Sequence, residues 1–423
     1  MAGGPAAGTE PGRSPAKPAV MVLCQVFHPD IQSTSQLLSD VLAVLAQAGR
    51  KITVISGYPG MHDGRPVAAA EIWQGVTIRR GGMRASVKKG PGLRTLTYLS
   101  YSWHAAWRLL WSRGKFRVLV VTNPPFLPVL VWLMCRLRGH QFKVMLQDIY
   151  PDGIVAIGRV RSGGMVDRLW RAANYRAFRA ANEVWVLGRD MAQLVWQRYQ
   201  VPPEKIRYIP HWSAVVIANP TQLEEGRLWA TLNLQGKFVV QYSGNMGLWH
   251  DIDTIVRAAA LLRGRPDILF LLIGQGMRRK CAEQLGKEIG ATNIIWLPYQ
   301  DRGELEDSLA CCHAALISQR AGLEGVAVPC KLYGILASGR AVIAQVPAGS
   351  EVALTVEEEQ CGRIVLPGDA AALAASIVEL EAAREETNRM GARAHAAYHA
   401  KYSLTSGAAA FERGFEEWPA LFQ

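Results

Sequence analysis

Short apolar runs alternate with longer segments of helical periodicity along most of the chain. Residues 19–27 form a nearly continuous apolar run, AVMVLCQVF, that ends at His-Pro-Asp, a pattern typical of a buried parallel strand. Residues 33–47 then place apolar side chains at helical spacing, Gly49 ends this segment, and residues 51–56 form a second apolar run. This order predicts a strand, a helix and a second strand connected by a right-handed crossover.

The same alternation predicts elements through the rest of the chain, interrupted once by a polar stretch at about residues 212–236. Before this stretch we expect strands at residues 73–79, 116–122, 142–147, 183–187 and 206–210, and helices at 96–110, 126–137 and 166–180. After it we expect strands at 237–242, 268–273, 294–297, 314–317 and 341–345, helices at 252–262, 277–289, 305–310 and 331–338, and helix from residue 370 nearly to the C-terminus. Two such series predict two doubly wound, Rossmann-like α/β domains facing across a cleft, with ligands at the carboxyl ends of the strands.

The length of 423 residues agrees with two domains, because a single hydrophobic core rarely keeps growing to this size. We expect a disordered tail at residues 1–18, which are rich in Ala, Gly and Pro and lack the apolar segment of a secretory signal. The first domain is predicted at residues 19–210, a linker at 211–236, the second domain at 237–405 and a terminal helix at 406–423.

The formal net charge of +12 favours anionic partners, although an ordinary basic protein accounts for it equally well. Several basic residues fall in one glycine-containing stretch that we interpret as an exposed loop: Arg79, Arg80, Arg84, Lys88, Lys89 and Arg94. Such a loop can meet anionic lipid head groups or a lipid-linked diphosphate, at about 1 kcal/mol for each basic residue near the surface. No recognised motif indicates nucleic-acid binding.

The seven cysteines are scattered and lack C-x-x-C spacing, so we expect buried free thiols in a reducing compartment and no zinc site. The longest apolar stretch, residues 118–135, is interrupted by Asn123 and three prolines. It is too broken for a membrane-spanning helix, which needs about twenty continuous apolar residues. These features predict a cytoplasmic protein that is soluble or peripheral at the inner face of the membrane.

Two glycine loops are candidates for phosphate contact. The first directly follows a predicted strand and comprises Tyr242, Ser243, Gly244, Asn245, Met246 and Gly247. The second, with Gly274 and Gly276, opens a helix that carries Arg279. Glycines let the backbone approach a phosphate, and amides at a helix start supply donors. An ordinary glycine turn explains each loop equally well, and a solvated helix face explains Arg279.

Further candidate residues lie at other predicted strand ends. Glu324 stands between glycines and is suited to holding sugar hydroxyls, the amides of Gly325 and Val326 to meeting the diphosphate or sugar, and Lys331 opens a helix. In the first domain, Asp148 and Asp152 are candidates for orienting the acceptor hydroxyl or the donor sugar, or for capping turns. The predicted acceptor side of the cleft also includes His28, Ser33, Thr34, Asn123 and Tyr150, and the donor side Pro298 and Tyr299.

Taken together, these segments resemble the family 4 retaining glycosyltransferases, and more narrowly the WbuB-like group of colanic acid and O-antigen sugar transfer. The matching motifs include VVTNPPF, LQDIYPDGIVAIG, YIPHW, YSGNMG, LLIGQG, WLPYQ and VPCKLYGILASGR, spread over nearly the whole chain after the tail. The resemblance implies a GT-B fold, a nucleotide-diphosphate sugar donor (UDP by analogy) in the second domain, and retention at the anomeric carbon. It also implies no catalytic metal or cofactor, an acceptor linked to polyprenyl diphosphate, and a last helix that crosses back onto the first domain.

Four positions depart from the pattern of that family. Glu324 matches the first of two glutamates, but the second position falls on Gly334. Ser243 and Asn245 lie near the places of an Arg and a Lys, and Asp148 replaces a histidine. Lys331 is therefore our main candidate for neutralising the donor diphosphate.

Two other functions fit the same features. One is a nucleotide-sugar 2-epimerase on the same fold, and the other is a non-catalytic sugar-nucleotide-binding partner of a membrane transferase. The aromatic helix at residues 96–110 and the basic stretch argue mildly for a membrane-facing acceptor site, although we favour core packing for its side chains: Tyr98, Tyr101, Trp103, Trp107 and, just beyond, Trp111.

Overall fold

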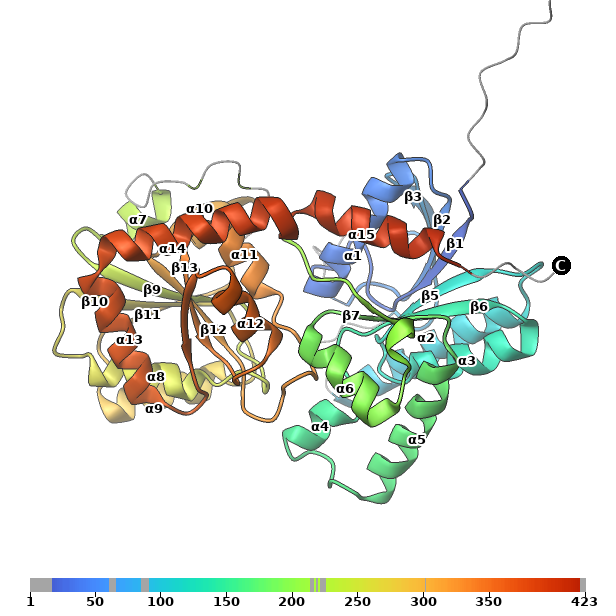
Figure 1. The fold of residues 1–423 in the computed structure, drawn as a ribbon, viewed down its shortest axis with the longest axis horizontal. Coiled ribbons are helices and arrows are strands. Elements are labelled where there is room, and N and C mark those ends of the chain that lie inside the picture. The colour runs from blue at the N-terminus through green and yellow to red at the C-terminus, as the bar shows by residue number, and fades with distance from the viewer. Residues whose placement is uncertain are drawn as a thin grey trace, which may run out of the picture.

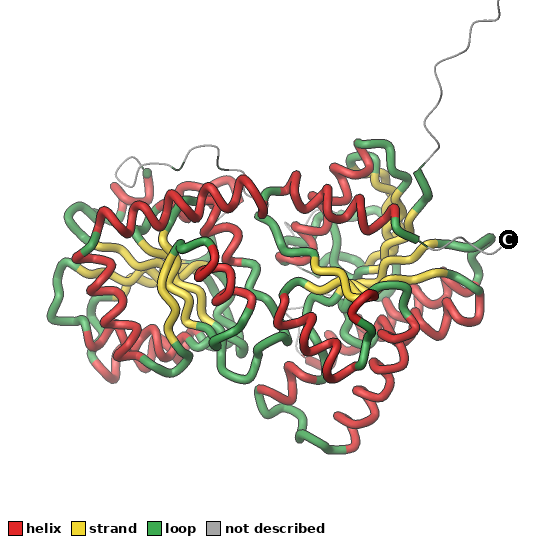
Figure 2. Tube along the Cα trace, viewed as in Figure 1, coloured by secondary structure: helices red, strands yellow, loops and turns green. Residues whose placement is uncertain are grey.

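Two sheets, one entirely parallel and one parallel except at one edge strand, form the cores of two domains and are each covered by helices on both faces (Figures 1 and 2). The structure is a computed structural model and describes residues 17–60, 66–84, 91–213, 217, 220, 226–300 and 302–418. Lys88, Lys89, the first sixteen residues and much of the predicted linker lie outside the described residues. The α/β fold with two Rossmann-like domains, predicted from the alternation of apolar runs, is confirmed.

The first sheet places its first strand in the middle. Its order is β3 (Ala70–Trp73), β4 (Val76–Arg80), β2 (Ile52–Ser56), β1 (Val20–Leu23), β5 (Arg117–Val121), β6 (Gln141–Met145), β7 (Val184–Val186) and β8 (Ile206–Tyr208). All neighbours are parallel except β3 and β4. The single strand predicted at residues 73–79 is wrong, because Gln74 and Gly75 both take positive φ angles and turn the chain into a hairpin.

The helices of the first domain are α1 (Ser33–Gln47), α2 (Pro91–Leu110), α3 (Leu127–Arg138), α4 (Asp152–Ala156), α5 (Met165–Ala180) and α6 (Arg189–Tyr199). Helix α1 has the bounds predicted from its apolar spacing, and its Leu38, Val41, Leu42 and Leu45 are buried. Helices α4 and α6 were not predicted. Among the described residues, no helix combines the length and the hydropathy needed to cross a membrane.

The second sheet has the order β11 (Ile294–Leu297), β10 (Ile268–Ile273), β9 (Phe238–Ser243), β12 (Ala314–Ser318), β13 (Ala341–Gln345) and β14 (Gly362–Val365), all parallel. Its helices are α7 (Arg227–Thr231), α8 (Ile252–Leu261), α9 (Arg279–Ile289), α10 (Leu305–Ala310), α11 (Lys331–Ala337), α12 (Glu351–Glu358), α13 (Ala370–Ala382) and α14 (Arg384–Ala397). Strand order reverses at β9, and ligands bind at the carboxyl end of such a switch point.

The chain ends by returning to the first domain (Figure 1). A π-helical turn (Tyr398–Tyr402) leads from α14 into α15 (Leu404–Glu416), which packs against α1. Phe411 and Phe415 belong to the first domain's core, and Glu412 pairs with Arg50 at 2.8 Å. The terminal helix therefore joins the two domains a second time, in addition to the connection after β8.

Candidate functional site

Two glycine loops pack backbone against backbone at the switch point of the second sheet. They follow β9 (residues 242–247) and β10 (residues 274–276). A Cβ atom at Gly274 would stand 2.0 Å from the carbonyl oxygen of Gly244, and one at Gly276 would stand 2.4 Å from that of Met246. Side chains are sterically excluded at both positions by the backbone of the facing loop, and we call this closely packed pair of loops the glycine floor. The structure thus brings the two predicted phosphate loops together.

A lysine cation packs on this floor. The Lys331 ammonium lies 4.0 Å from the centroid of the Tyr242 ring and donates hydrogen bonds to the Tyr242 hydroxyl and, at 3.1 Å, to the Asn245 carbonyl. Burial lowers the pKa of Lys331 to about 7. In the described part of the chain no carboxylate forms an ion pair with it. Lys331 is therefore a partly desolvated cation that lacks an anionic partner, which is the state suited to receiving a phosphate.

The first domain contributes Asp148 to the junction between the domains. Asp148 follows β6 and forms an antiparallel bridge with Ala327. Burial raises the pKa of Asp148 to about 7. The pKa of the Cys330 thiol is raised by burial and by Asp148, and held down by Ser33 and Lys331, so these groups from both domains surround one side chain. Asp148 and Lys331 thus both lie near Cys330 at the domain junction, where each influences the pKa of its thiol.

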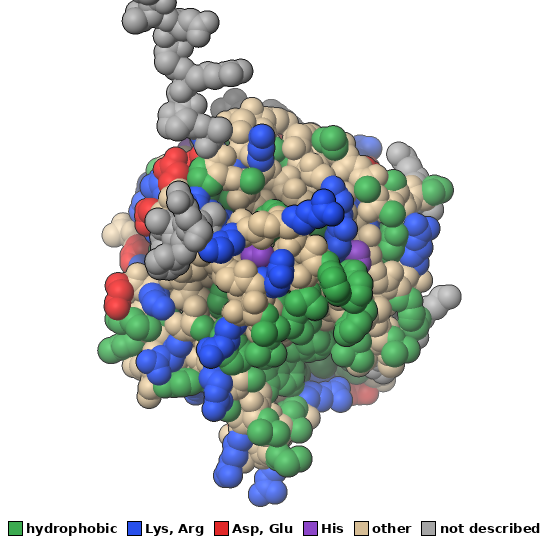
Figure 3. Space-filling model, turned by 90° about the vertical axis from the view of Figure 1, so that its right-hand side faces the viewer, with side chains coloured by type: hydrophobic (Ala, Val, Ile, Leu, Met, Phe, Trp, Pro, Cys, Tyr) green, Lys and Arg blue, Asp and Glu red, His purple; other side chains and the backbone are tan. Residues whose placement is uncertain are grey.

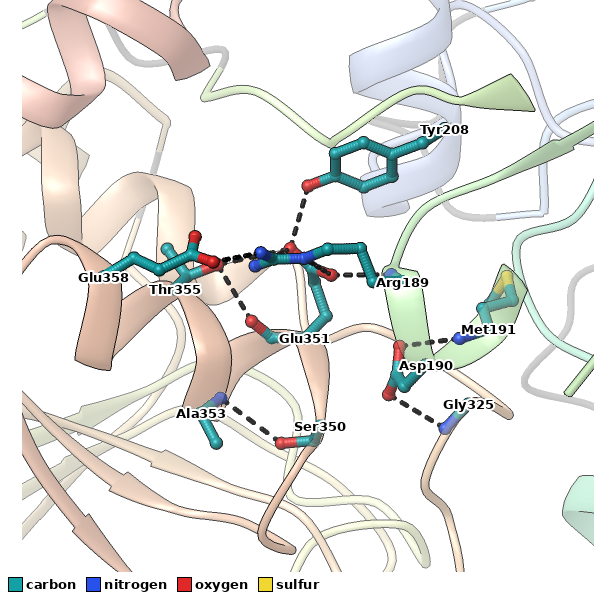
Figure 4. A network of polar contacts seen from close by, with 10 residues as sticks. All are labelled: Arg189, Asp190, Met191, Tyr208, Gly325, Ser350, Glu351, Ala353, Thr355 and Glu358. Atoms are coloured by element: carbon teal, nitrogen blue, oxygen red, sulfur yellow. Dashed lines mark hydrogen bonds and ion pairs between the residues drawn. The ribbon is translucent and has the colours of Figure 1, made fainter. Parts of the chain in front are cut away.

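An ion-pair network, the interdomain latch (Arg189, Tyr208 and Glu351), closes the domains on each other (Figure 4). The backbone amide and Nε of Arg189, at the start of α6, donate to the carboxylate of Glu351 in α12 at 2.7 and 3.0 Å. The Tyr208 hydroxyl donates to the same carboxylate at 2.8 Å. Glu351 is only 1% exposed, so its charge depends on these partners from the first domain.

The amides of Gly325 and Val326 do not have the role predicted for them. The Gly325 amide donates to Asp190 Oδ2 at 2.9 Å (Figure 4), and the Val326 amide donates to the Leu323 carbonyl at 3.1 Å. Both donors are used in domain contact and loop closure rather than left for a diphosphate. Glu324, which directly precedes Gly325, is exposed.

Three predicted donor residues shape the floor instead of facing a ligand. Tyr242 and Met246 are fully buried in the second domain's core. The guanidinium of Arg279 donates to the carbonyls of Gly274 and Leu297 and pairs with Glu283, so this side chain positions the second loop. Asn245, Pro298 and Tyr299 are exposed, and Ser243 is half-buried.

Asp152 belongs to a buried cluster within the first domain. Its carboxylate pairs with Arg171 and Arg198 and accepts a hydrogen bond from the Tyr199 hydroxyl. The side chain is fully buried, and these three donors occupy its oxygens. We therefore replace the predicted role in orienting substrate with a structural one, which ties α4 to α5 and α6.

Replacing Asp152 with alanine is expected to lower the free energy of unfolding by about 3 kcal/mol, because it leaves the buried Tyr199 hydroxyl without its acceptor and the partly exposed Arg171 and Arg198 without their shared anion. Urea denaturation of the purified protein measures this loss. The control is Asp148→Asn, which removes a carboxyl that burial already disfavours as an anion and which we expect to stay within about 1 kcal/mol of the wild type. An Asp152→Ala variant as stable as the wild type would remove the structural assignment.

A pocket opens in the first domain at the carboxyl ends of its central strands. It is lined by Gln25, Tyr58, Thr97, Tyr98 and Asn123, together with the exposed Arg94. Gln25 is buried, and its Oε1 accepts no hydrogen bond within the described part of the chain. The Arg94 Nε donates to the Tyr98 hydroxyl at 2.7 Å. Gln25 and Tyr58 were not predicted as site residues, since neither carries a charge or belongs to a motif that marks it.

The other predicted acceptor residues do not line this pocket. Ser33 begins α1 and contacts Cys330, and Thr34 follows it. The centroid of the Tyr150 ring lies 6.1 Å from that of Trp170 and 6.0 Å from that of Trp249 in the second domain. Trp249 was not among the predicted site residues. The His28 ring stacks on Trp73 at 4.1 Å and does not line the pocket.

Comparison with known proteins agrees with the two-domain geometry. The model described as "Glycosyl transferases group 1" matches residues 229–397, and the model described as "Glycosyl transferase 4-like domain" matches residues 34–212. Between them they cover both domains. The chain belongs to the family 4 glycosyltransferases of the GT-B fold. This identification confirms the resemblance seen in the sequence motifs.

Two curated relatives of this glycosyltransferase carry names from the same field. The chain is 26% identical to WbjE of Pseudomonas aeruginosa, which is named as a probable glycosyltransferase. The match spans 62% of this chain and 65% of WbjE, so the chain covers less than two thirds of the length of WbjE. The chain is 24% identical to WcaI of Escherichia coli (strain K12), named as a colanic acid biosynthesis glycosyl transferase, over 75% of this chain and 81% of that protein.

Solved structures share the fold of this glycosyltransferase at low sequence identity. Sucrose-phosphate synthase from Thermosynechococcus elongatus superimposes with a TM-score of 0.72 at 18% identity, over 95% of this chain and 99% of that one. HepE from Anabaena, in complex with UDP and glucose, superimposes with a TM-score of 0.69 at 13% identity, over 95% of this chain and 100% of the HepE chain. At these identities the likeness establishes the GT-B fold.

Proposed function

We propose that this glycosyltransferase transfers a sugar, with retention at the anomeric carbon, from a UDP-sugar to a lipid-linked or other glycan acceptor in polysaccharide or glycoconjugate biosynthesis. The observation that carries the proposal is the Lys331 cation on the glycine floor, which has no anionic partner in the described part of the chain. The names of WbjE and WcaI support the glycan pathway, and the UDP bound by HepE supports the choice of nucleotide.

In this proposal the donor diphosphate lies on the glycine floor beside Lys331. The ammonium stabilises the charge that develops on the leaving diphosphate, which is the largest catalytic contribution expected at such a site. Glu324 orients the donor sugar, and Asp148 faces it from the first domain. We propose that this arrangement works without a divalent metal, so that EDTA leaves the rate unchanged.

The acceptor occupies the first-domain pocket. The unpartnered Oε1 of Gln25 is suited to a sugar hydroxyl, because a buried amide oxygen without a donor is costly until a ligand supplies one. The exposed Arg94 is suited to a phosphate. Closure of the domains by the interdomain latch keeps water from the donor and so suppresses its hydrolysis.

Thermal stabilisation by a panel of nucleotides tests the donor assignment. We expect UDP to stabilise the protein by about 2.7 kcal/mol at a hundredfold excess over its dissociation constant, and GDP, ADP and CMP to stabilise it much less. Lys331→Ala is the matched control and is expected to lose most of the shift with UDP. No shift with any nucleotide would contradict the proposal.

Turnover assays separate the remaining alternatives. A 2-epimerase converts its nucleotide sugar without an acceptor, whereas a transferase releases UDP in proportion to the acceptor supplied. A non-catalytic partner binds nucleotide and shows no turnover with any acceptor. We expect release of UDP that depends on a lipid-diphosphate-linked sugar, measured by coupled assay.

A further inference from the structure

Helix α2 carries an exposed row of tryptophans. Trp103, Trp107 and Trp111 follow one another at intervals of four residues and are 71%, 51% and 66% exposed. Their ring centroids are 6.4 and 5.2 Å apart, so the three indoles form one continuous strip. The core packing that we favoured for this helix holds for Tyr101, which is buried, but is wrong for the tryptophans.

Helix α3 packs beside α2 and widens this strip. Leu133 and Leu137 are exposed on α3, and Arg138 Nη2 donates to the Ser112 carbonyl at 3.0 Å, which ties together the C-terminal ends of the two helices. We call the resulting surface the tryptophan face (Trp103, Trp107, Trp111, Leu133 and Leu137). Large adjoining apolar side chains exposed in this way mark an interaction site.

The charge of the chain is concentrated around the same helices. Residues 72–147 contain thirteen lysines and arginines and no aspartate or glutamate, whereas the net charge of the whole protein is +12. This segment, which includes α2 and α3, therefore accounts for all of the excess of positive over negative charge in the protein. Figure 3 shows Lys and Arg side chains around a gathering of hydrophobic ones at this end of the molecule, with acidic side chains at the margin. The exposed basic residues beside the helix ends are Arg113, Lys115, Arg136 and Arg138.

We propose that the tryptophan face docks on an anionic lipid bilayer. Tryptophan has an apolar ring and a polar N–H group, and it concentrates at the level of lipid head groups. A surface with aromatic side chains in the middle and basic ones at the edge gains both from apolar burial and from attraction to anionic lipids. The absence of carboxylates from this stretch of sequence favours a uniformly anionic surface over a protein partner of mixed charge.

Docking in this way places the acceptor pocket next to the bilayer. Thr97, Tyr98 and Tyr101 line the pocket from the same helix that presents the tryptophans. A lipid-linked acceptor would then enter along α2, with its lipid in the membrane and its diphosphate near Arg94. This last consequence rests on the proposed function, whereas the docking itself does not.

Sedimentation with vesicles tests the docking directly. We expect the full chain to bind vesicles of phosphatidylcholine with about 30% phosphatidylglycerol, and to bind pure phosphatidylcholine at least about tenfold more weakly. The triple variant Trp103→Ser, Trp107→Ser, Trp111→Ser is expected to lose about tenfold or more in affinity for the anionic vesicles. The matched control replaces three side chains of similar exposure elsewhere, Trp196→Ser, Leu261→Ser and Leu366→Ser, and is expected to bind as the wild type does.

A charge variant keeps the test independent of the tryptophan substitutions. Arg113→Glu with Arg136→Glu is expected to weaken binding to anionic vesicles about tenfold and to make it less sensitive to salt. The control reverses two exposed basic residues of the second domain, Arg257→Glu with Lys287→Glu, at the same change in net charge. Equal losses in both charge variants would show non-specific attraction and would overturn the assignment to this face.

Two further outcomes would also overturn it. One is wild-type protein that stays in the supernatant with anionic vesicles. The other is a concentration-dependent dimer that the triple tryptophan variant abolishes, which would assign the face to a second copy of the chain. The stabilisation by UDP is measured without lipid on the same variants. If the wild-type protein does not bind anionic vesicles but is stabilised by UDP, only the docking proposal is contradicted. If UDP does not stabilise the wild-type protein, only the proposed function is contradicted.

Discussion

Replacing Lys331 with methionine is expected to slow sugar transfer by about two to three orders of magnitude, while the melting temperature stays at or above that of the wild type. The loss follows from removing the group that stabilises charge on the leaving diphosphate. The retained stability follows from the lowered pKa of about 7, which shows that the folded protein disfavours the charged ammonium. Measuring kcat and Tm on the same preparations checks the loss of activity and the retained stability. A variant with wild-type turnover would remove Lys331 from the mechanism.

The sign of the pH dependence follows from the same pKa. The unfolded chain holds a proton on this lysine up to its ordinary pKa of 10.5, and the folded protein releases it at about 7. Between these values the unfolded state binds more protons, so the contribution of Lys331 to stability rises with pH in that window. Below pH 7 the full cost of the buried charge is present. The methionine variant is expected to lack this rise, which thermal melts at pH 6.5 and 9 measure.

Binding of UDP is expected to show the opposite trend. The diphosphate favours the protonated lysine, so its dissociation constant should increase by up to about tenfold per pH unit above 7. Asp148 also has a pKa of about 7, and its anion repels the ligand in the same range. Calorimetry on Asp148→Asn and on Lys331→Arg separates the two groups. A slope that survives in Lys331→Arg and disappears in Asp148→Asn would assign the titration to the aspartate.

The sheets were predictable because parallel strands that are buried on both faces are short continuous apolar runs. Strand β9, for example, is buried along nearly its whole length, and the sequence shows it as an unbroken run after a polar segment. The hairpin of β3 and β4 was less visible, since β3 lies at the sheet edge and alternates exposed and half-buried positions. Edge strands carry a weaker apolar pattern than central ones.

The roles of individual site residues depended on partners far away in sequence. Asp148 and Asp152 look alike beside the same strand, but Arg198, from α6, reaches only Asp152. The amide of Gly325 faces Asp190, which lies 135 residues earlier. Glycine loops were easier to recognise, because the positive φ angles of Gly244, Gly274 and Gly276 are a local backbone property that favours glycine in the sequence.

The exposure of the three tryptophans also could not be predicted from the helical spacing of apolar residues alone. Tyr101 and Trp103 are both aromatic residues of α2, and only the position of the sheet beneath the helix makes the first a core residue and the second an exposed one. A row of aromatic side chains at helical spacing is compatible with either outcome. The concentration of basic residues around the helix is the signal in the sequence that favours the exposed one.

Breaking the interdomain latch by Arg189→Ala is expected to open the domains and to reduce transfer by at least about tenfold. The substitution removes the guanidinium from the buried carboxylate of Glu351 and leaves the backbone amide of residue 189 and the Tyr208 and Thr355 hydroxyls as its donors. A buried charge that has lost its counter-ion costs about 3–5 kcal/mol. The protein can avoid that cost by separating the domains and hydrating Glu351. Small-angle scattering should therefore show a larger radius of gyration in the variant, and kcat should fall because closure excludes water.

A double-mutant cycle distinguishes the latch from general destabilisation. Removing both partners in Arg189→Ala with Glu351→Ala is expected to cost less than the sum of the single changes, because no buried charge is then left unpaired. The control is Arg363→Ala, whose contact with Glu379 at 3.9 Å lies within the second domain and on its surface, and which we expect to change stability by less than about 1 kcal/mol. Additive costs, or a radius of gyration that does not change, would show that the terminal helix α15 and not the latch holds the domains closed. In that case the catalytic loss in Arg189→Ala would have to come from the neighbouring contact of Asp190 with Gly325, which positions the loop leading to Lys331.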